Sequence, residues 1–410
     1  MKITKEAKNA IMIGGLCSAS YLAVYFARNI LSAVTPKIVN GDEAMVEYIG
    51  VVSSLYFIFY AVGQLINGII GDKIKAKYMI SFGLLLAGAT NIVFPYIFHI
   101  QNVAKFLYAM TGFFLSMIYA PMTKVVAENT NPIHTVRCSL GYELAALLGS
   151  PFAGLVASFL VWQSVFFVGS IALFVMAGLC MIFFIYFERK GIVTYGKYVP
   201  TYTQSTQNHS FFSKINILIK HRIIIFSLIS IITGVIRTTV VFWLPTYFSQ
   251  YLGYSQDEAP VIFSVATLLI SFSAFIAVFV YERLHRNMDL TILIMFTASA
   301  LFFLGVYFLK NPVINIIFIV LAVIASNCCA SMLWSRYCPS LRDTGMVSSA
   351  TGYLDFLSYM AAAASSTIFA NSVSTIGWGN LILIWMGLMV FGIFIMIPYK
   401  KIFNKKWRLR

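Results

Sequence analysis

The feature of this sequence that most restricts its fold is a series of long apolar segments without a single Asp, Glu, Lys or Arg. Segments of this kind cover residues 48–71, 78–104, 106–123, 259–281, 290–309 and 311–335. Each can form an α-helix of about 20 residues, the length that crosses a hydrocarbon layer roughly 30 Å thick. Only 10% of the residues are charged, whereas a soluble domain has about 25%. The sequence therefore predicts an all-α integral membrane protein.

Two further charge-free segments are too long for one helix each. Residues 144–187 and 356–399 would each extend about 66 Å at 1.5 Å per residue, roughly twice the thickness of the apolar layer. We expect the first to break near Val161–Ser164 and the second near Ser374–Asn380, where polar residues and Gly interrupt the apolar pattern. Spans that begin near residues 8 and 223 bring the total to twelve transmembrane helices, with the first helix of the second long segment starting near residue 344.

The two halves of the chain repeat one another. Arg28 and Pro36 are followed 209 residues later by Arg237 and Pro245, and each Arg lies within an apolar span. Such a match predicts a parallel duplication whose pseudo-two-fold axis runs along the membrane normal. The expected domains are a six-helix bundle over residues 1–187, a polar linker over 188–222, and a second six-helix bundle with a basic tail over 223–410.

Lys and Arg residues in the loops predict the orientation of the chain, because they concentrate on the cytoplasmic side of a membrane. With the N-terminus inside, 24 of the 29 Lys and Arg residues fall on the cytoplasmic side. Only Lys37, Lys105 and Lys310 fall outside. We therefore expect both termini to be cytoplasmic, with a bacterial cytoplasmic membrane as the location. This rule also explains the net charge of +15, so the charge does not indicate a nucleic-acid partner.

Several chemical functions lack their sequence signatures. The six Cys residues have no metal-type spacing, and by this map no His falls in the middle of a helix. No phosphate-binding loop of the form GxxxxGK[ST] occurs, which argues against ATP-driven pumping by this chain alone. No nucleophile and base stand in an enzyme-like arrangement. We therefore predict a protein that is not an enzyme and has no cofactor or metal.

The two intramembrane arginines are the strongest functional signal. A charged side chain at the centre of a membrane costs about 2.5–3.5 kcal/mol on insertion scales, so its presence calls for a reason. A guanidinium group offers a planar fork of donors that matches phosphate or carboxylate oxygens. Arg28 and Arg237, one from each half, are therefore candidates for a symmetric clamp on an anion. The alternative is that they pair with the two acids found within spans, Glu143 and Asp355.

At these residues the chain resembles a known family, the organophosphate:phosphate antiporters of the major facilitator superfamily. The first helix has Tyr25, Arg28 and Pro36 in the family's spacing, and the seventh has "RTTVVFWLPTY", which begins at Arg237. The resemblance implies the major facilitator fold and phosphoryl binding by the two arginines. The segment "GIIGDKIKAK" is similar to the loop signature of the superfamily, and it contributes the conformational-loop candidates Gly68, Gly71, Asp72 and Lys73.

Other candidate ligand-binding residues follow from helical spacing. Tyr21, Tyr25 and Arg28 share one face of the first helix, and Tyr60 and Gln64 share one face of the second. Some relatives that move glycerol phosphate or hexose phosphates have Lys at the position of Gln64, so this site carries less positive charge. Two carboxylates could balance the two arginines. That balance would suit an anion that also bears an amine, or coupling to protons through Glu143 and Asp355.

Three functional interpretations follow. The first is a secondary transporter of a small organic anion, an organophosphate exchanged for inorganic phosphate by alternating access. The second is a proton-coupled transporter of another anion or zwitterion that uses Glu143 and Asp355. The third is a membrane sensor that binds a phosphorylated ligand without transporting it. We expect a monomer in a lipid bilayer whose partners are a small anion and phosphate or protons as coupling species.

Overall fold

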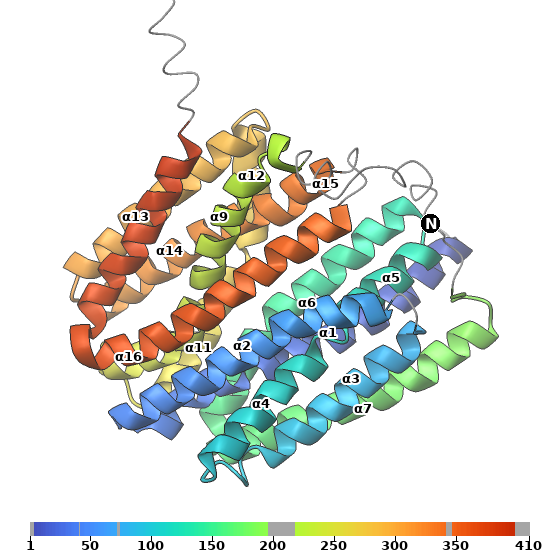
Figure 1. The fold of residues 1–410 in the computed structure, drawn as a ribbon, viewed down its shortest axis with the longest axis horizontal. Helices are drawn as coiled ribbons and strands as arrows, with labels where there is room; N and C mark the ends of the chain where they lie inside the picture. The colour runs from blue at the N-terminus through green and yellow to red at the C-terminus, as the bar shows by residue number, and fades with distance from the viewer. Residues whose placement is uncertain (1–3, 41, 72–73, 196–217, 342–346, 398–410) are drawn as a thin grey trace, which may run out of the picture. The chain divides into compact units, whose positions relative to one another are not determined.

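The computed structural model describes residues 4–40, 42–71, 74–195, 218–341 and 347–397 (Figure 1). None of these residues forms a β-strand. The first half of the chain contains α1 (Lys5–Val39), α2 (Glu43–Gly71), α3 (Ala76–Val93), α4 (Gln101–Leu115), α5 (Tyr119–Asn129), α6 (Pro132–Phe159) and α7 (Trp162–Arg189). The all-α prediction is confirmed.

The second half continues the helical pattern, with two short π-helical segments. Its elements are α9 (Ile223–Gly234), η2 (Val235–Val240), α10 (Val241–Gln250), α11 (Glu258–Ser271), α12 (Ser273–Arg283), α13 (Met288–Phe308), α14 (Pro312–Met332), η3 (Leu333–Tyr337), α15 (Cys338–Ser340) and α16 (Val347–Met396). Both π-helical segments, η2 and η3, continue directly from an α-helix of a membrane span.

The lengths and compositions of these helices fit a multi-pass membrane protein. Within the described residues, ten helices are long and apolar enough to cross a membrane. The apolar part of α6 at Leu144–Phe159 and the first part of α16 complete the twelve expected helices. Both predicted breaks are present. Helix α6 ends at Phe159 before α7 begins at Trp162, and α16 is interrupted at Gly377, where φ is 73°.

The chain divides into two compact units that do not follow the two sequence halves. The first unit consists of Met1–Asn208, Thr238–Ser271 and Tyr359–Thr375, and the second of His209–Arg237, Phe272–Ser358 and Ile376–Arg410. The first unit therefore combines the N-terminal half with α10, α11 and parts of η2 and α16 from the other half. This division rests on contacts, whereas the predicted boundaries at 187 and 223 rest on the internal repeat and stay a prediction.

Within the first unit, small residues let α1 pack closely against α6. The two helices run side by side in Figure 1. A Cβ atom at Gly149 of α6 would lie 2.5 Å from the backbone carbonyl carbon of Tyr25, and one at Gly14 of α1 would lie 2.6 Å from the Cys138 sulfur. Side chains at these positions would force the helices apart. Close approach of backbones is the usual way in which helices associate within membranes.

Also within the first unit, α2 packs against the Tyr359–Thr375 part of α16 through short polar side chains. The Ser54 hydroxyl donates to the carbonyl oxygen of Ala363 at 2.7 Å, and the hydroxyls of Ser53 and Ser366 share a hydrogen bond. Two similar bonds join other helices of the unit. Ser32 donates to the Phe242 carbonyl at 2.5 Å, and Ser264 donates to the Pro151 carbonyl at 2.6 Å.

Polar contacts between loops agree with the predicted sides of the membrane. The Lys37 ammonium lies 2.7 Å from the Asp257 carboxylate and donates to the carbonyl of Leu160 at 3.2 Å. Lys37 is predicted to lie on the outer side, and these contacts place Asp257 and Leu160 beside it. On the side assigned to the cytoplasm, Lys75 forms an ion pair of 2.8 Å with Glu188, and this carboxylate raises the pKa of Lys75. The contacts group the helix ends as expected, while the orientation itself stays a prediction.

The contact between α2 and α16 can be tested by cross-linking. We expect Ser53→Cys combined with Ser366→Cys to form a disulfide on mild oxidation, because the native hydroxyls already lie within hydrogen-bond reach. If the two helices must separate during transport, the oxidised protein loses uptake and regains it after reduction. Ser53→Cys with Ser365→Cys is the matched control, because the Ser365 hydroxyl bonds to Thr239 instead. Absence of a cross-link at 53 and 366 would contradict the packing.

Candidate functional site

The side chain of Arg28 lies among four aromatic rings in the first unit. Its guanidinium carbon is 5.2 Å from the ring centroid of Tyr25 on the same helix. It is 5.0 Å and 5.8 Å from the rings of Tyr60 and Phe57 on α2, and 4.8 Å from the ring of Tyr359 on α16. All four distances are within the range of cation–π attraction. We call Tyr25, Phe57, Tyr60 and Tyr359 the aromatic cage.

The cage orients the guanidinium while using only part of its hydrogen-bonding capacity. Arg28 Nη1 donates to the Tyr359 hydroxyl at 2.9 Å, and a guanidinium has five N–H donors. Among the side chains that the structure describes, no carboxylate forms an ion pair with Arg28. The side chain of Glu143 lies outside the described ones, so the alternative Arg28–Glu143 pair stays a prediction. Further donors of Arg28 can therefore bind an anion beside the Tyr359 hydroxyl.

One face of α1 is accessible as far as Arg28 and closed beyond it. Ile11, Gly15, Ser18, Leu22 and Tyr25 follow one another at intervals of three or four residues, and none of them is buried. Arg28 and the next residue are also only partly buried. In contrast, every residue from 30 to 36 is buried. Within the first unit, this accessible face of α1 therefore forms a stripe that begins near the N-terminus of the helix and ends at the aromatic cage.

The serine contacts described above lie on the closed side of Arg28. The hydroxyl of Ser32, one turn after Arg28, bonds to the carbonyl of Phe242, and Thr35 is fully buried one turn further on. Helix α10 is equally enclosed, with its residues from Phe242 to Phe248 all buried. This closed part has no accessible stripe comparable to that of the N-terminal half of α1. Within the first unit, the accessible face of α1 therefore approaches the cage from one side only.

Arg237 lies in the second unit, in the π-helical segment η2. Its guanidinium carbon is 6.0 Å from the ring of Trp334, which belongs to the other π-helical segment, η3. π-Helical turns are rare and often occur at functional sites, because they redirect side chains from the regular helical positions. The side chain of Arg237 is partly exposed. Because Arg28 and Arg237 belong to different units, their convergence on one ligand stays a prediction.

The remaining predicted ligand-binding residues divide into two groups. Tyr60 belongs to the aromatic cage, and Gln64 lies one turn further along α2, where it is partly exposed. Tyr21 is buried and packs against Tyr25, Tyr119 and Tyr142, with ring centroids 4.9, 5.5 and 6.0 Å away. Tyr21 therefore supports the Tyr25 side of the cage from behind.

The two acids predicted for coupling lie in α6 and α16. Asp355 is one helical turn before Tyr359 on α16 and is partly exposed. Glu143 lies within α6, but its side chain is outside the described ones. The structure therefore places Asp355 near the start of the helix that supplies a cage residue.

The conformational loop is described only in part, because Asp72 and Lys73 lie outside the described residues. Gly71 ends α2 in close contact with α5. A Cβ atom there would lie 3.2 Å from Pro121, and its carbonyl accepts a hydrogen bond of 3.4 Å from Lys124. A Cβ atom at Gly68 would have no neighbour within 4 Å. Glycine allows a close approach of helices at both positions, and such a contact is present at Gly71, whereas the side of α2 at Gly68 is open.

Three residues near the arginines were missed by the sequence argument. Phe57 precedes Tyr60 by three residues, so helical periodicity could have found it. Tyr359 follows Asp355 by four residues, a weaker signal, because its partner Arg28 is more than 300 residues away. Trp334 had no local signal at all. Its position near Arg237 depends on how η3 packs within the second unit.

Comparison with known families identifies the chain. The family model of the Major Facilitator Superfamily matches residues 17–366. The chain belongs to this superfamily. It is thus an integral multi-pass membrane protein of a transporter superfamily, not an enzyme. The fold agrees with this assignment, since the crystal structure of a D-xylose–proton symporter superposes with a TM-score of 0.75 at 13% sequence identity, covering 95% of this chain and 97% of that one.

Curated relatives match shorter stretches. The membrane sensor protein UhpC of Salmonella typhimurium is 31% identical over 94 residues, which are 23% of this chain and 21% of that protein. A probable hexose phosphate transport protein of Chlamydia pneumoniae is 31% identical over 77 residues, or 18% of this chain and 16% of that protein. The match thus spans about a fifth of each relative's length.

The hydrogen bond between Arg28 and Tyr359 generates a prediction. Tyr359→Phe keeps the ring of the cage and removes the acceptor of Arg28. We expect the ligand-free variant to melt at a lower temperature, because a hydrogen bond to a charged group contributes about 1.5–3 kcal/mol to stability. The loss should be smaller than this, because water can take the place of the Tyr359 hydroxyl at this partly exposed site. Thermal unfolding in detergent measures the change. Tyr60→Phe is the control, because its ring faces Arg28 but Arg28 donates to Tyr359. Equal destabilisation by both variants would contradict this role.

Proposed function

We propose that this protein is a secondary transporter of a small organic anion, an organophosphate exchanged for inorganic phosphate by alternating access. The observation that carries the proposal is the environment of Arg28. Its guanidinium is held by an aromatic cage within a membrane span, is reached along an accessible stripe, and has no ion-pair partner among the described side chains. An anion is the ligand that this arrangement favours.

The aromatic cage suits anion binding for an electrostatic reason. Ring faces attract a cation but cannot neutralise its charge, so the field of Arg28 remains available to a ligand. Neighbouring carboxylates would instead compete with an anion. In a region of low dielectric constant the attraction between guanidinium and phosphate is stronger than in water. Planar guanidinium groups also bind phosphate through two parallel hydrogen bonds, which fixes the orientation of the ligand.

The proposed second half of the clamp is Arg237. The internal repeat gives it the position equivalent to Arg28, and parallel duplication would bring equivalent positions to one central cavity. Its π-helical setting beside Trp334 supports a functional role. In this proposal residues 1–187 and 223–410 form two six-helix bundles joined by a cytoplasmic linker. The monomer lies in a bacterial cytoplasmic membrane with both termini inside.

The phosphorylated class of substrate is supported by the relatives, one of which is named a probable hexose phosphate transport protein. Two features point away from a plain sugar phosphate. Gln64 stands where some relatives have Lys, and Asp355 and Glu143 add negative charge to the spans. We therefore infer a substrate that carries an amine in addition to its phosphate, or a transport cycle in which a carboxylate takes up a proton.

The second candidate function is a sensor. One observation favours it, namely the 31% identity over 94 residues to the membrane sensor protein UhpC. A sensor would use the same anion-binding residues without moving the ligand across the membrane. Uptake into proteoliposomes separates the two functions, since a sensor binds the ligand and transports nothing.

The arginine clamp predicts the effect of four substitutions. Arg28→Lys and Arg237→Lys keep the positive charge but lose the planar fork, so each should lose most of the binding of a phosphorylated ligand. The Ala variants should lose more, because hydrogen bonds to charged groups contribute about 1.5–3 kcal/mol each. Isothermal titration calorimetry on folded protein, with inorganic phosphate as one of the ligands, measures the affinities. Normal binding by both folded Ala variants would overturn the clamp.

The acids predict a pH dependence of transport. Glu143→Gln and Asp355→Asn remove one ionisable group each while conserving size. If either residue is protonated during the cycle, the pH profile of proteoliposome uptake flattens in that variant, and a pH gradient no longer stimulates uptake. Asp257→Asn is the control, because this residue is an exposed loop acid that pairs with Lys37. Unchanged profiles in both variants would rule out proton coupling through these residues.

A further inference from the structure

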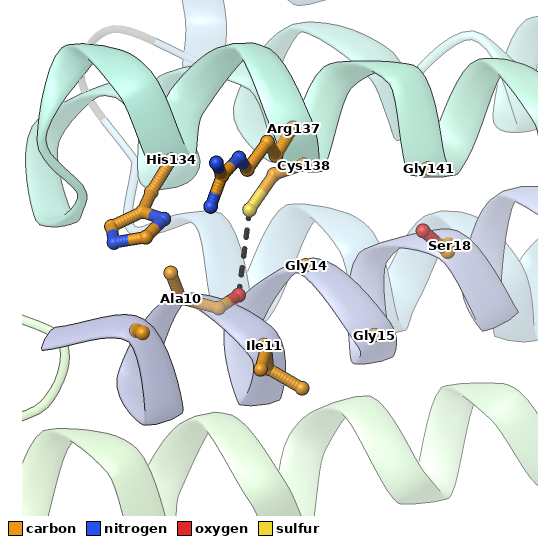
Figure 2. Close-up of a pocket in the computed structure, with 10 residues that line it drawn as sticks. Ala10, Ile11, Gly14, Gly15, Ser18, His134, Arg137, Cys138 and Gly141 are labelled. Carbon is orange, nitrogen blue, oxygen red and sulfur yellow. Dashed lines mark hydrogen bonds between the residues drawn. The ribbon is translucent and has the colours of Figure 1, made fainter. Parts of the chain in front are cut away.

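A groove separate from the aromatic cage lies between the N-terminal parts of α1 and α6 (Figure 2). It has a volume of about 400 Å³. Most of its lining consists of residues with little or no side chain, namely Ala7, Ala10, Gly14, Gly15, Ser18 and Gly141. The remaining lining residues include His134 and Arg137 of α6. The groove thus combines open space on α1 with basic side chains on α6.

The basic side chains point into this groove. In Figure 2, His134 and Arg137 project from α6 toward α1, above Ala10. Arg137 is exposed, and among the described side chains it has no ion-pair partner. One carboxylate lies near the rim, since Asn131 donates to Glu6 at 3.3 Å. Both basic residues belong to the first turns of α6, where the helix dipole also favours negative charge.

The groove is continuous with the stripe that leads to Arg28. Gly15 and Ser18 line the groove and also belong to the accessible face of α1. From Ser18 the same face continues through Leu22 and Tyr25 to Arg28, which is about 15 Å further along the helix at 1.5 Å per residue. A small anion in the groove therefore lies at the start of the accessible face, and the aromatic cage lies at its end.

We propose that this groove is an access subsite that captures the anion before it reaches Arg28. The ligand class is a small phosphate-bearing or carboxylate-bearing anion, attracted by Arg137 and His134. The missing side chains of Gly15 and Gly141 provide the space in which it lies. This role rests on the proposed function, because an access subsite needs a cargo anion that continues to the cage.

A competing explanation is that Arg137 only anchors the chain on its cytoplasmic side, as basic residues commonly do. In that case its charge acts on the general surface potential, and any basic residue on the same side would have the same effect. Arg189 provides the comparison, because it is an exposed Arg at the end of α7 and does not line the groove. A local test of charge within the groove separates the two explanations.

The experiment places a thiol in the groove and measures how charged reagents reach it. Gly15→Cys suits this purpose, because a Cβ atom there has no neighbour within 4 Å and the position is exposed. The native Cys residues are all buried, and Cys138, which also lines the groove, is replaced by Ser in every protein tested. The full-length protein in detergent is treated with an anionic or a cationic methanethiosulfonate, and the ratio of the two rates reports the local potential. Inorganic phosphate then serves as the competing anion.

We expect the anionic reagent to react faster than the cationic one, and phosphate to slow it. Adding Arg137→Ala should lower the rate ratio about fivefold to tenfold, since a unit charge a few ångströms away acts oppositely on the two reagents. Arg189→Ala should leave the ratio within about twofold, because its charge lies outside the groove and is screened by salt.

Two results would overturn the subsite. One is an equal effect of Arg137→Ala and Arg189→Ala, and the other is a lack of protection by phosphate when the protein binds phosphate normally by calorimetry. The proposed function fails in a different way. If calorimetry detects no anion binding that depends on Arg28 while phosphate still protects Gly15→Cys, the groove is an anion site without transport. His134→Gln with Gly15→Cys shows whether the imidazole contributes to the protection.

Discussion

The arrangement of the aromatic cage depends on one constraint, the free-energy cost of removing the positive charge of Arg28 from water. An Arg in a membrane span must be compensated, and the compensation here comes from ring faces and a phenolic oxygen. Aromatic faces stabilise the guanidinium without neutralising it. Because the rings come from α1, α2 and α16, the same charge also draws three helices of the first unit together. The site and the helix packing therefore share one electrostatic cause.

The closed side of the first unit is held by contacts that can be broken at low cost. The helices meet there through Ser hydroxyls that donate to carbonyl oxygens and through small residues such as Gly50, which faces Ala370. Hydrogen bonds between membrane helices contribute only about 0.6 kcal/mol on average. Large interdigitated side chains would raise the free energy needed to separate the helices. Small polar contacts instead allow the balance between closed and open states to be shifted by a ligand, as alternating access requires.

Sequence reasoning predicted the features that depend on length and period, and missed those that depend on packing. The break before Trp162 and the interruption at Gly377 follow from helices too long for a bilayer. Tyr25 and Tyr60 follow from helical spacing. Tyr359 does not, since its contact with Arg28 joins residues more than 300 positions apart. Gly71 makes a close contact with α5 whereas Gly68 has open space beside it, and the sequence pattern does not distinguish the two positions.

Binding and transport make different demands, and this difference bears on the choice between a sensor and a transporter. Both need the chemistry of Arg28, so similarity to a sensor protein and to a transport protein is compatible with one binding site. A sensor can leave its closed side permanently packed, whereas a transporter must open it in every cycle. The closed side of the first unit, around Ser32 and Ser54, consists of short side chains and single hydrogen bonds. This composition favours a contact that opens and closes, and it therefore favours the transporter over the sensor.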